Sequence, residues 1–218
     1  LNMDIDKLKV YVWYTSNIKE YIELLEESCK DFNDLEIIHC IHTEEVKDKN
    51  LQMGDTVKTS YQDLMVKRWK ILPDIIKGNI GNNIVWLDAD CVFNKNNKNF
   101  NQIISFYLKD HDFIFQYDDN SGLCENLNTG IMGIKCSTET LKVVNCWYED
   151  IITKTDRRPG FPLLEWNEIF TKHPEYGVSF SILPQDYCSG QGNWGIYHAI
   201  SVPANQKLPL LKQKHLNL

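Results

Sequence analysis

The chain has 218 residues, of which 43% are hydrophobic and 11% aromatic, enough to bury the core of one compact domain. Its formal net charge of -7, with scattered Lys and Arg, argues against a nucleic-acid backbone as partner, because phosphate neutralisation needs clustered cations. No run approaches the ~18 apolar residues of a membrane span, and the first residues contain no signal-peptide core. We therefore expect a soluble chain without a membrane span and a cytoplasmic location.

Seven cysteines occur in the chain, with no CxxC spacing between them. Most stand beside apolar residues, where a free cysteine behaves as a small buried hydrophobe. An odd, dispersed set of this kind favours a reducing compartment.

The chain begins with a predicted strand, helix and strand, over residues 8–14, 18–29 and 35–41. Ser16 or Asn17 is the expected N-cap of the helix. A unit of this kind is parallel and right-handed, and its ligand lies beyond the carboxyl ends of the strands.

Tyr14 ends the first predicted strand and Thr15 follows it, so they are candidates for holding the base and ribose of a nucleotide. A core aromatic at a strand end explains Tyr14 equally well. The polar, weakly periodic residues 43–59 predict a loop.

Arg68 interrupts an apolar stripe on a helix predicted to begin at Ser60. Steps of 100° place it in line with Leu64, Met65 and Leu72. A guanidinium directed toward a core needs a carboxylate or phosphate partner. We expect Arg68 to contact a diphosphate or Asp88, and the alternative is a purely structural buried salt bridge.

Two aspartates, Asp88 and Asp90, stand inside an apolar run that extends from Ile84 to Phe93. Buried carboxylates are costly unless a positive charge meets them, and divalent cations are the usual partner of clustered carboxylates. Alternation along one strand would place both side chains on the same face. The pattern predicts a metal site that holds a phosphate-bearing substrate, and the alternative is a turn in which both side chains cap backbone amides.

The segment V-W-L-D-A-D-C-V-F, residues 85–93, resembles the DxD segment of GT-A type glycosyltransferases, which are metal-dependent and use nucleotide sugars. The chain is also similar to small stand-alone transferases of large DNA viruses. The resemblance implies one α/β domain over residues 1–218, GT-A-like (Rossmann-like), with a mostly parallel central sheet and helices on both faces. Its nucleotide-binding part would span residues 8–93, and its sugar and acceptor part residues 112–200.

The same resemblance implies the ligands of the protein. The cofactor would be Mn2+ or Mg2+, and the donor a nucleoside diphosphate sugar such as a UDP-hexose. The acceptor would be a glycan or another hydroxyl compound. For a viral protein the location would be the host cytoplasm.

A helix over residues 100–108 and a strand over residues 112–117 are predicted next. Then come Asn128, Thr129 and Gly130, which resemble an Asn-Thr-Gly segment that lines the sugar pocket in this family. Asn128 offers a donor and an acceptor to sugar hydroxyls, and Gly130 permits close backbone approach. The alternative is a β-turn before an edge strand.

A carboxylate that assists the transfer is expected near residues 165–168, after a helix over residues 139–148 and a basic loop over residues 156–162. Many such transferases carry an Asp-Gln pair there, whereas this chain has Glu165 and Glu168. Either group would deprotonate the acceptor or stabilise charge at the anomeric carbon, with Asp186 as a further candidate.

His198 lies in an apolar strand predicted around residues 194–200. Many proteins of this fold bring a C-terminal histidine back to the metal, so the resemblance implies Asp88, Asp90 and His198 as the ligand set. The default alternative is a core histidine with a hydrogen-bond partner.

Two other functions suit the carboxylate pair. A nucleotidyltransferase or sugar-nucleotide pyrophosphorylase also binds metal with carboxylates, but usually has a Gly-rich phosphate loop after its first strand, where this chain has Tyr14 to Asn17. A nucleotide- or glycan-binding module without turnover is the other alternative.

Overall fold

The computed structural model describes residues 7–42, 59–118, 127–153, 166, 169, 174–189, 194–200 and 202–218. Its strands are β1 (Leu8–Thr15), β2 (Leu35–His42), β3 (Asn83–Asp88), β4 (Cys91–Phe93), β5 (Phe113–Tyr117), β6 (Leu127–Lys135), β7 (Phe180–Ile182), β8 (Cys188–Ser189) and β9 (Ile196–His198). Its α-helices are α1 (Lys19–Cys29), α2 (Thr59–Trp69), α3 (Leu72–Lys77), α4 (Phe100–Asp110), α5 (Thr138–Thr153) and α7 (Ala204–Asn217).

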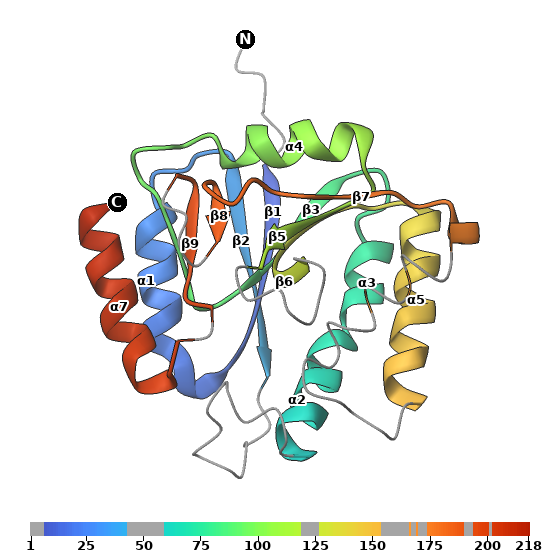
Figure 1. Cartoon of the computed structure of the whole chain (residues 1–218), viewed down its shortest axis with the longest axis horizontal. Helices are drawn as coiled ribbons and strands as arrows, with labels where there is room; N and C mark the ends of the chain where they lie inside the picture. Colours follow the sequence, from blue (N-terminus) through green and yellow to red (C-terminus); the bar gives the residue numbers. More distant parts are fainter. Residues whose placement is uncertain are drawn as a thin grey trace.

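A central sheet of six strands has the order β2-β1-β3-β6-β5-β7. The β1–β2, β1–β3 and β5–β7 pairs are parallel, whereas β6 is antiparallel to both of its neighbours, so β6 alone runs against the other five strands. One face of the sheet packs on α1 and α4, and the other on α2, α3 and α5 (Figure 1). This arrangement confirms the predicted α/β fold.

The predicted strand-helix-strand unit is present at the start of the chain. β1 and β2 pair in parallel from Leu8 opposite Leu35 to Thr15 opposite His42. The predicted N-cap is wrong, because a 3-10 turn includes Ser16 and Asn17, and α1 then begins without a side-chain cap.

Two helices differ from their predicted extents. The helix that carries Arg68 ends at Trp69, and Leu72 begins α3, in which Pro73 occupies the first turn, where its missing N–H costs nothing. Helix α5 extends to Thr153, beyond the predicted end at residue 148, and buries Thr140, Val143, Val144, Trp147 and Ile151.

A second, three-stranded sheet, in the order β4-β9-β8, lies beside the first. Helix α7 covers it, and Leu211 of this helix packs with Val92 of β4 and Tyr197 of β9. In Figure 1, α7 stands alongside α1, and the two helices are joined by an ion pair between Lys212 and Glu20.

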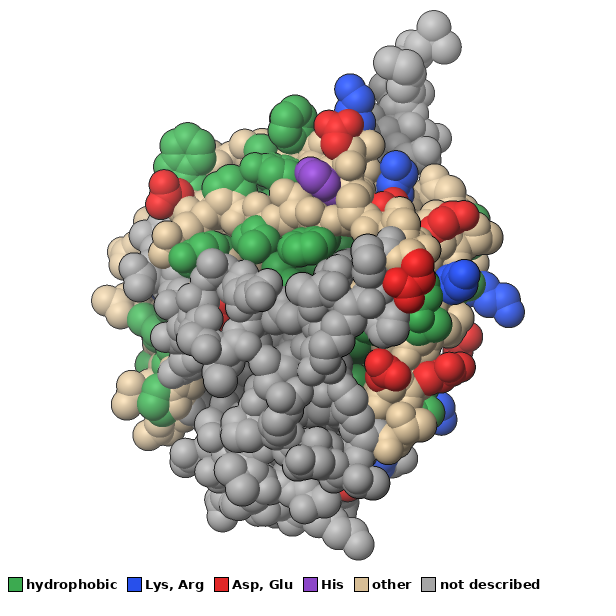
Figure 2. Space-filling view, turned by 45° about the vertical axis from the view of Figure 1, so that its right-hand side comes forward, with side chains coloured by type: hydrophobic (Ala, Val, Ile, Leu, Met, Phe, Trp, Pro, Cys, Tyr) green, Lys and Arg blue, Asp and Glu red, His purple; other side chains and the backbone are tan. Residues whose placement is uncertain are grey.

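The molecular surface in Figure 2 carries charges of both signs, and on that face the described Lys and Arg side chains lie among Asp and Glu side chains. Six described cysteines are free thiols. No helix in the described part of the chain is long and apolar enough to cross a membrane.

Candidate active site

The two aspartates lie at a turn between two strands, not within one strand as predicted. β3 ends at Asp88, the chain bends at Ala89 and Asp90, and β4 begins at Cys91 in the second sheet. Both flanking strands are buried, which explains why the sequence reads as one continuous apolar run. The prediction that strand alternation brings the two carboxylates together is therefore wrong.

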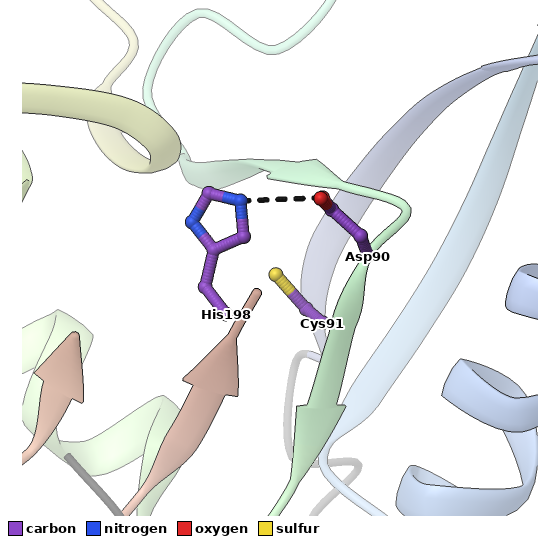
Figure 3. Close-up of side chains that lie close together, drawn as sticks. All are labelled: Asp90, Cys91 and His198. Carbon is purple, nitrogen blue, oxygen red and sulfur yellow. Dashed lines mark ion pairs between the residues drawn. The ribbon is translucent and has the colours of Figure 1, made fainter. Parts of the chain in front are cut away.

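His198 meets both carboxylates. Its Nε2 atom lies 3.2 Å from Oδ1 of Asp90 and 3.6 Å from Oδ2 of Asp88. Figure 3 shows the imidazole, which projects from β9, directed at Asp90. Pairing of β4 with β9 places Cys91 opposite His198, and the amide of Ala199 donates to the carbonyl oxygen of Asp90 at 3.0 Å. The second sheet thus holds the histidine against the turn.

Arg68 forms an ion pair with Asp88, one of the partners predicted for it. Arg68 is 8% exposed, and its Cζ atom lies 4.6 Å from the ring centroid of Trp69, 5.5 Å from that of Trp86 and 6.0 Å from that of Trp13. Flat aromatic faces stabilise a planar cation by cation–π attraction. The aromatic rings therefore fix Arg68 beside Asp88.

Lys207 of α7 is a member of the site that the sequence analysis missed. The residue is 2% exposed, and its ammonium group pairs with Oδ2 of Asp90. Burial alone would raise the pKa of Asp90, but the nearby His198 and Lys207 outweigh it and hold this pKa below its usual range. Helical spacing from the buried Leu211 was the available signal, the same signal that identified Arg68.

Gln116 of β5 was also missed. It is fully buried, and its Oε1 atom lies 2.7 Å from Nδ1 of His198. A polar residue between Phe115 and Tyr117 in an apolar strand was the signal that could have identified it.

The Asn-Thr-Gly residues lie within β6, a central strand, and not in a turn before an edge strand. Asn128 accepts a hydrogen bond from the amide of Gly130 at 2.7 Å and donates one to Oδ2 of Asp118 at 3.3 Å. Thr129 is half-buried. Gly130 faces the imidazole of His198. Glycine is required here because a Cβ atom would collide with this ring.

Tyr14 and Thr15 lie at the end of β1, next to Trp13, which is opposite Asp88 in the β1–β3 pair. The Tyr14 hydroxyl lies 3.3 Å from Nδ1 of His39, and Nε2 of that histidine lies 3.1 Å from Oε1 of Glu26. These contacts fix the phenol ring at the carboxyl end of the sheet, where the predicted nucleotide would lie.

The predicted catalytic carboxylates are not joined to this cluster by any described contact. Glu165 and Glu168 lie outside the described residues, as does the basic loop 156–162. Asp186 is exposed in the turn before β8, and its backbone carbonyl accepts a hydrogen bond from Trp194. Their roles stay predictions.

The residues at this turn suit a divalent cation. Nε2 of His198 is buried and makes no hydrogen bond, although two carboxylates face it. Ligand atoms of Asp90, Cys91 and His198 all lie within 4.8 Å of one another. Burial, followed by the nearby Asp90 and Asp88 charges, raises the pKa of Cys91 well above its usual value, which disfavours the thiolate that metals bind.

Comparisons with known proteins identify the family and the fold of the chain. The family model for nucleotide-diphospho-sugar transferases matches residues 25–205. No curated protein sequence matches the chain. A glycosyltransferase involved in the glycosylation of the major capsid of PBCV-1 superposes with a TM-score of 0.67 and 14% identity, over 95% of this chain and 99% of that chain.

The glycosyltransferase GlyE of Streptococcus pneumoniae TIGR4 superposes with a TM-score of 0.60 and 11% identity, over 97% of this chain and 60% of that chain. At these identities, both superpositions show that the fold is shared. Because the family match extends over most of the sequence and includes Asp88, Asp90 and His198, the chain belongs to the nucleotide-diphospho-sugar transferase family and is a glycosyltransferase with the GT-A fold.

Proposed function

We propose that the protein is a metal-dependent transferase that moves a hexose from a UDP-hexose to a hydroxyl group of a glycan. The observation that carries the proposal is the convergence of Asp88 and Asp90 on the buried Nε2 of His198. Two carboxylates and an imidazole form a donor set that suits Mn2+ and also accommodates Mg2+. Family membership supports a nucleotide-sugar donor.

Asp88, Asp90 and His198 would hold the ion. When bound, it would act as a Lewis acid that neutralises the leaving diphosphate. Arg68 and Lys207 are each paired with one aspartate, so two cations are already fixed beside the carboxylates. We assign to them the stabilisation of the phosphate oxygens as negative charge develops on the leaving group.

The donor would lie across the carboxyl ends of β1 and β3. Tyr14 and Thr15 would contact the base and ribose. Asn128 and Thr129 would contact the sugar, and the hydrogen bond from Asn128 to the buried Asp118 supports this assignment because it orients the amide.

Deprotonation of the acceptor is assigned to Glu165, with Glu168 and Asp186 as further candidates. A carboxylate within hydrogen-bond reach of the acceptor hydroxyl would accept its proton as the oxygen attacks the anomeric carbon.

The experiment is a screen of UDP-hexoses with and without glycan acceptors, in Mn2+ and in EDTA, in which released UDP is measured. The proposal predicts UDP release that requires metal and increases with an acceptor. Asp88→Asn should abolish this release, whereas the control Asp74→Asn, at an exposed position on α3, should retain it. Release of pyrophosphate instead would indicate a nucleotidyltransferase, and donor binding without any release would indicate a binding module.

A further inference from the structure

We propose that Gln116 is a positioning residue that holds His198 in the tautomer with its proton on Nδ1. The inference deepens the proposed function, on which the metal part of it rests. The side chain of Gln116 contacts the imidazole of His198, and it would act only through the histidine.

The contact between the two side chains is short and buried. Oε1 of Gln116 lies 2.7 Å from Nδ1 of His198, and the two residues are 0% and 2% exposed. No water competes for a hydrogen bond that is buried in this way. An Nδ1–H group that donates to Oε1 leaves Nε2 with a free electron pair.

An irregularity in the sheet brings Gln116 to this position. Phe115 is opposite Met132, but Gln116 is opposite Asn128, where a regular antiparallel ladder would place Ile131. Residues 129–131 of β6 therefore have no partner on β5. Bulges of this kind re-aim side chains and are common beside active sites.

The same bulge contains Gly130, which packs against the imidazole of His198. A Cβ atom on Gly130 would lie 2.1 Å from Cε1 and 2.6 Å from Nδ1 of His198. The imidazole is thus held by an amide acceptor at Nδ1 and by the backbone of β6 along its edge, which restricts rotation of the ring.

The tautomer decides whether the site can accept a cation. With the proton on Nδ1, the electron pair of Nε2 faces the carboxylates of Asp90 and Asp88, and the three groups together attract a positive ion. With the proton on Nε2, this atom would donate to Asp90, and the histidine could not be a ligand. Second-shell partners of metal-binding histidines commonly set this choice.

The first test is the tautomer itself, which a merely structural role for Gln116 would leave unchanged. Long-range 1H–15N correlation spectra of metal-free, 15N-histidine-labelled protein report which ring nitrogen carries the proton. Loss of signals in His198→Gln assigns the residue. We expect Nδ1–H in the wild type and in Gln116→Glu, which keeps an acceptor, and Nε2–H in Gln116→Met.

The second test is Mn2+ binding, measured by calorimetry. Gln116→Met should weaken binding by about 10- to 100-fold, the usual cost of losing a second-shell partner, and Gln116→Glu should retain it. Asn79→Leu is the control, because it removes another buried amide that donates to Tyr11 and Ile75, near the opposite end of β1. It should leave the affinity for Mn2+ unchanged.

The outcomes separate the two proposals. An Nε2–H tautomer in the wild type overturns the positioning role, whether or not the protein binds metal. An Nδ1–H tautomer that is retained in Gln116→Met also overturns it. An Nδ1–H tautomer that depends on Gln116, in a protein that binds no Mn2+, supports the positioning role and contradicts the proposed metal site. If Gln116→Met does not fold, the spectra of the wild type and Gln116→Glu decide.

Discussion

The imidazole of His198 packs directly on the backbone of Gly130, where a Cβ atom would lie 2.1 Å from the Cε1 atom of the ring. Gly130→Ala must therefore displace the histidine from Asp88 and Asp90. We expect the affinity for Mn2+ to fall at least tenfold, as judged by calorimetry, because a ligand that is misplaced loses its alignment with the other two.

Gly133 provides the matched control on the same strand. A Cβ atom there would lie 2.4 Å from Cγ1 of Ile114, in the core and away from the histidine. Gly133→Ala should lower the melting temperature but leave the affinity for Mn2+ unchanged. Equal affinities in the wild type and Gly130→Ala would show that the position of His198 does not matter for metal binding.

The Asp90–Lys207 pair predicts a stability effect that accompanies the loss of metal binding. Asp90→Asn removes the carboxylate charge that pairs with the buried ammonium of Lys207, and breaking a buried pair in this way costs about 3–5 kcal/mol. Urea unfolding should show this loss, and the double variant Asp90→Asn/Lys207→Met should recover most of it. Neither variant should bind Mn2+. Full stability in Asp90→Asn would contradict the buried pair.

Arg68→Lys tests whether the guanidinium serves the donor or only the fold. Lysine keeps the charge but loses the planar fork and the stacking on Trp69, so we expect the Kd for UDP to rise about tenfold with a smaller effect on stability. Lys67→Gln, at an exposed position on the same helix, is the control. A sharp drop in melting temperature at unchanged affinity would identify a purely structural salt bridge.

Glu165→Gln tests the assignment of the catalytic carboxylate. The substitution keeps the size of the side chain and removes its basicity, so kcat should fall by ~100-fold or more with little change in the Kd for the donor. The kcat of Asp186→Asn, at an exposed position, is measured for comparison. Near-normal turnover in Glu165→Gln would redirect the assignment to Glu168 or Asp186.

Local patterns were enough to predict the first part of the fold. The alternation in β1 and β2, and the apolar face of α1, are signals within single elements. The break between β3 and β4 was not predictable in this way, because strands buried on both sides show no alternation. The sequence around Asp88 and Asp90 therefore reads the same with or without a turn.

The site was predicted where one residue conflicts with its local surroundings. Arg68 on an apolar stripe and the two aspartates beside an apolar strand are such conflicts. Gln116 was missed because its position depends on a bulge between β5 and β6, which is a tertiary property. Lys207 was missed because its spacing from Leu211 is the one local signal, and its burial depends on the packing of α7 on the second sheet.

The most direct test of the proposed metal site is anomalous diffraction at the manganese absorption edge, from crystals grown with Mn2+ and UDP. We expect one anomalous peak bonded to Asp88, Asp90 and Nε2 of His198, with the diphosphate of UDP on the same ion. A peak bonded to Cys91 in place of Asp88, or UDP bound with no ion at the two aspartates, would contradict it.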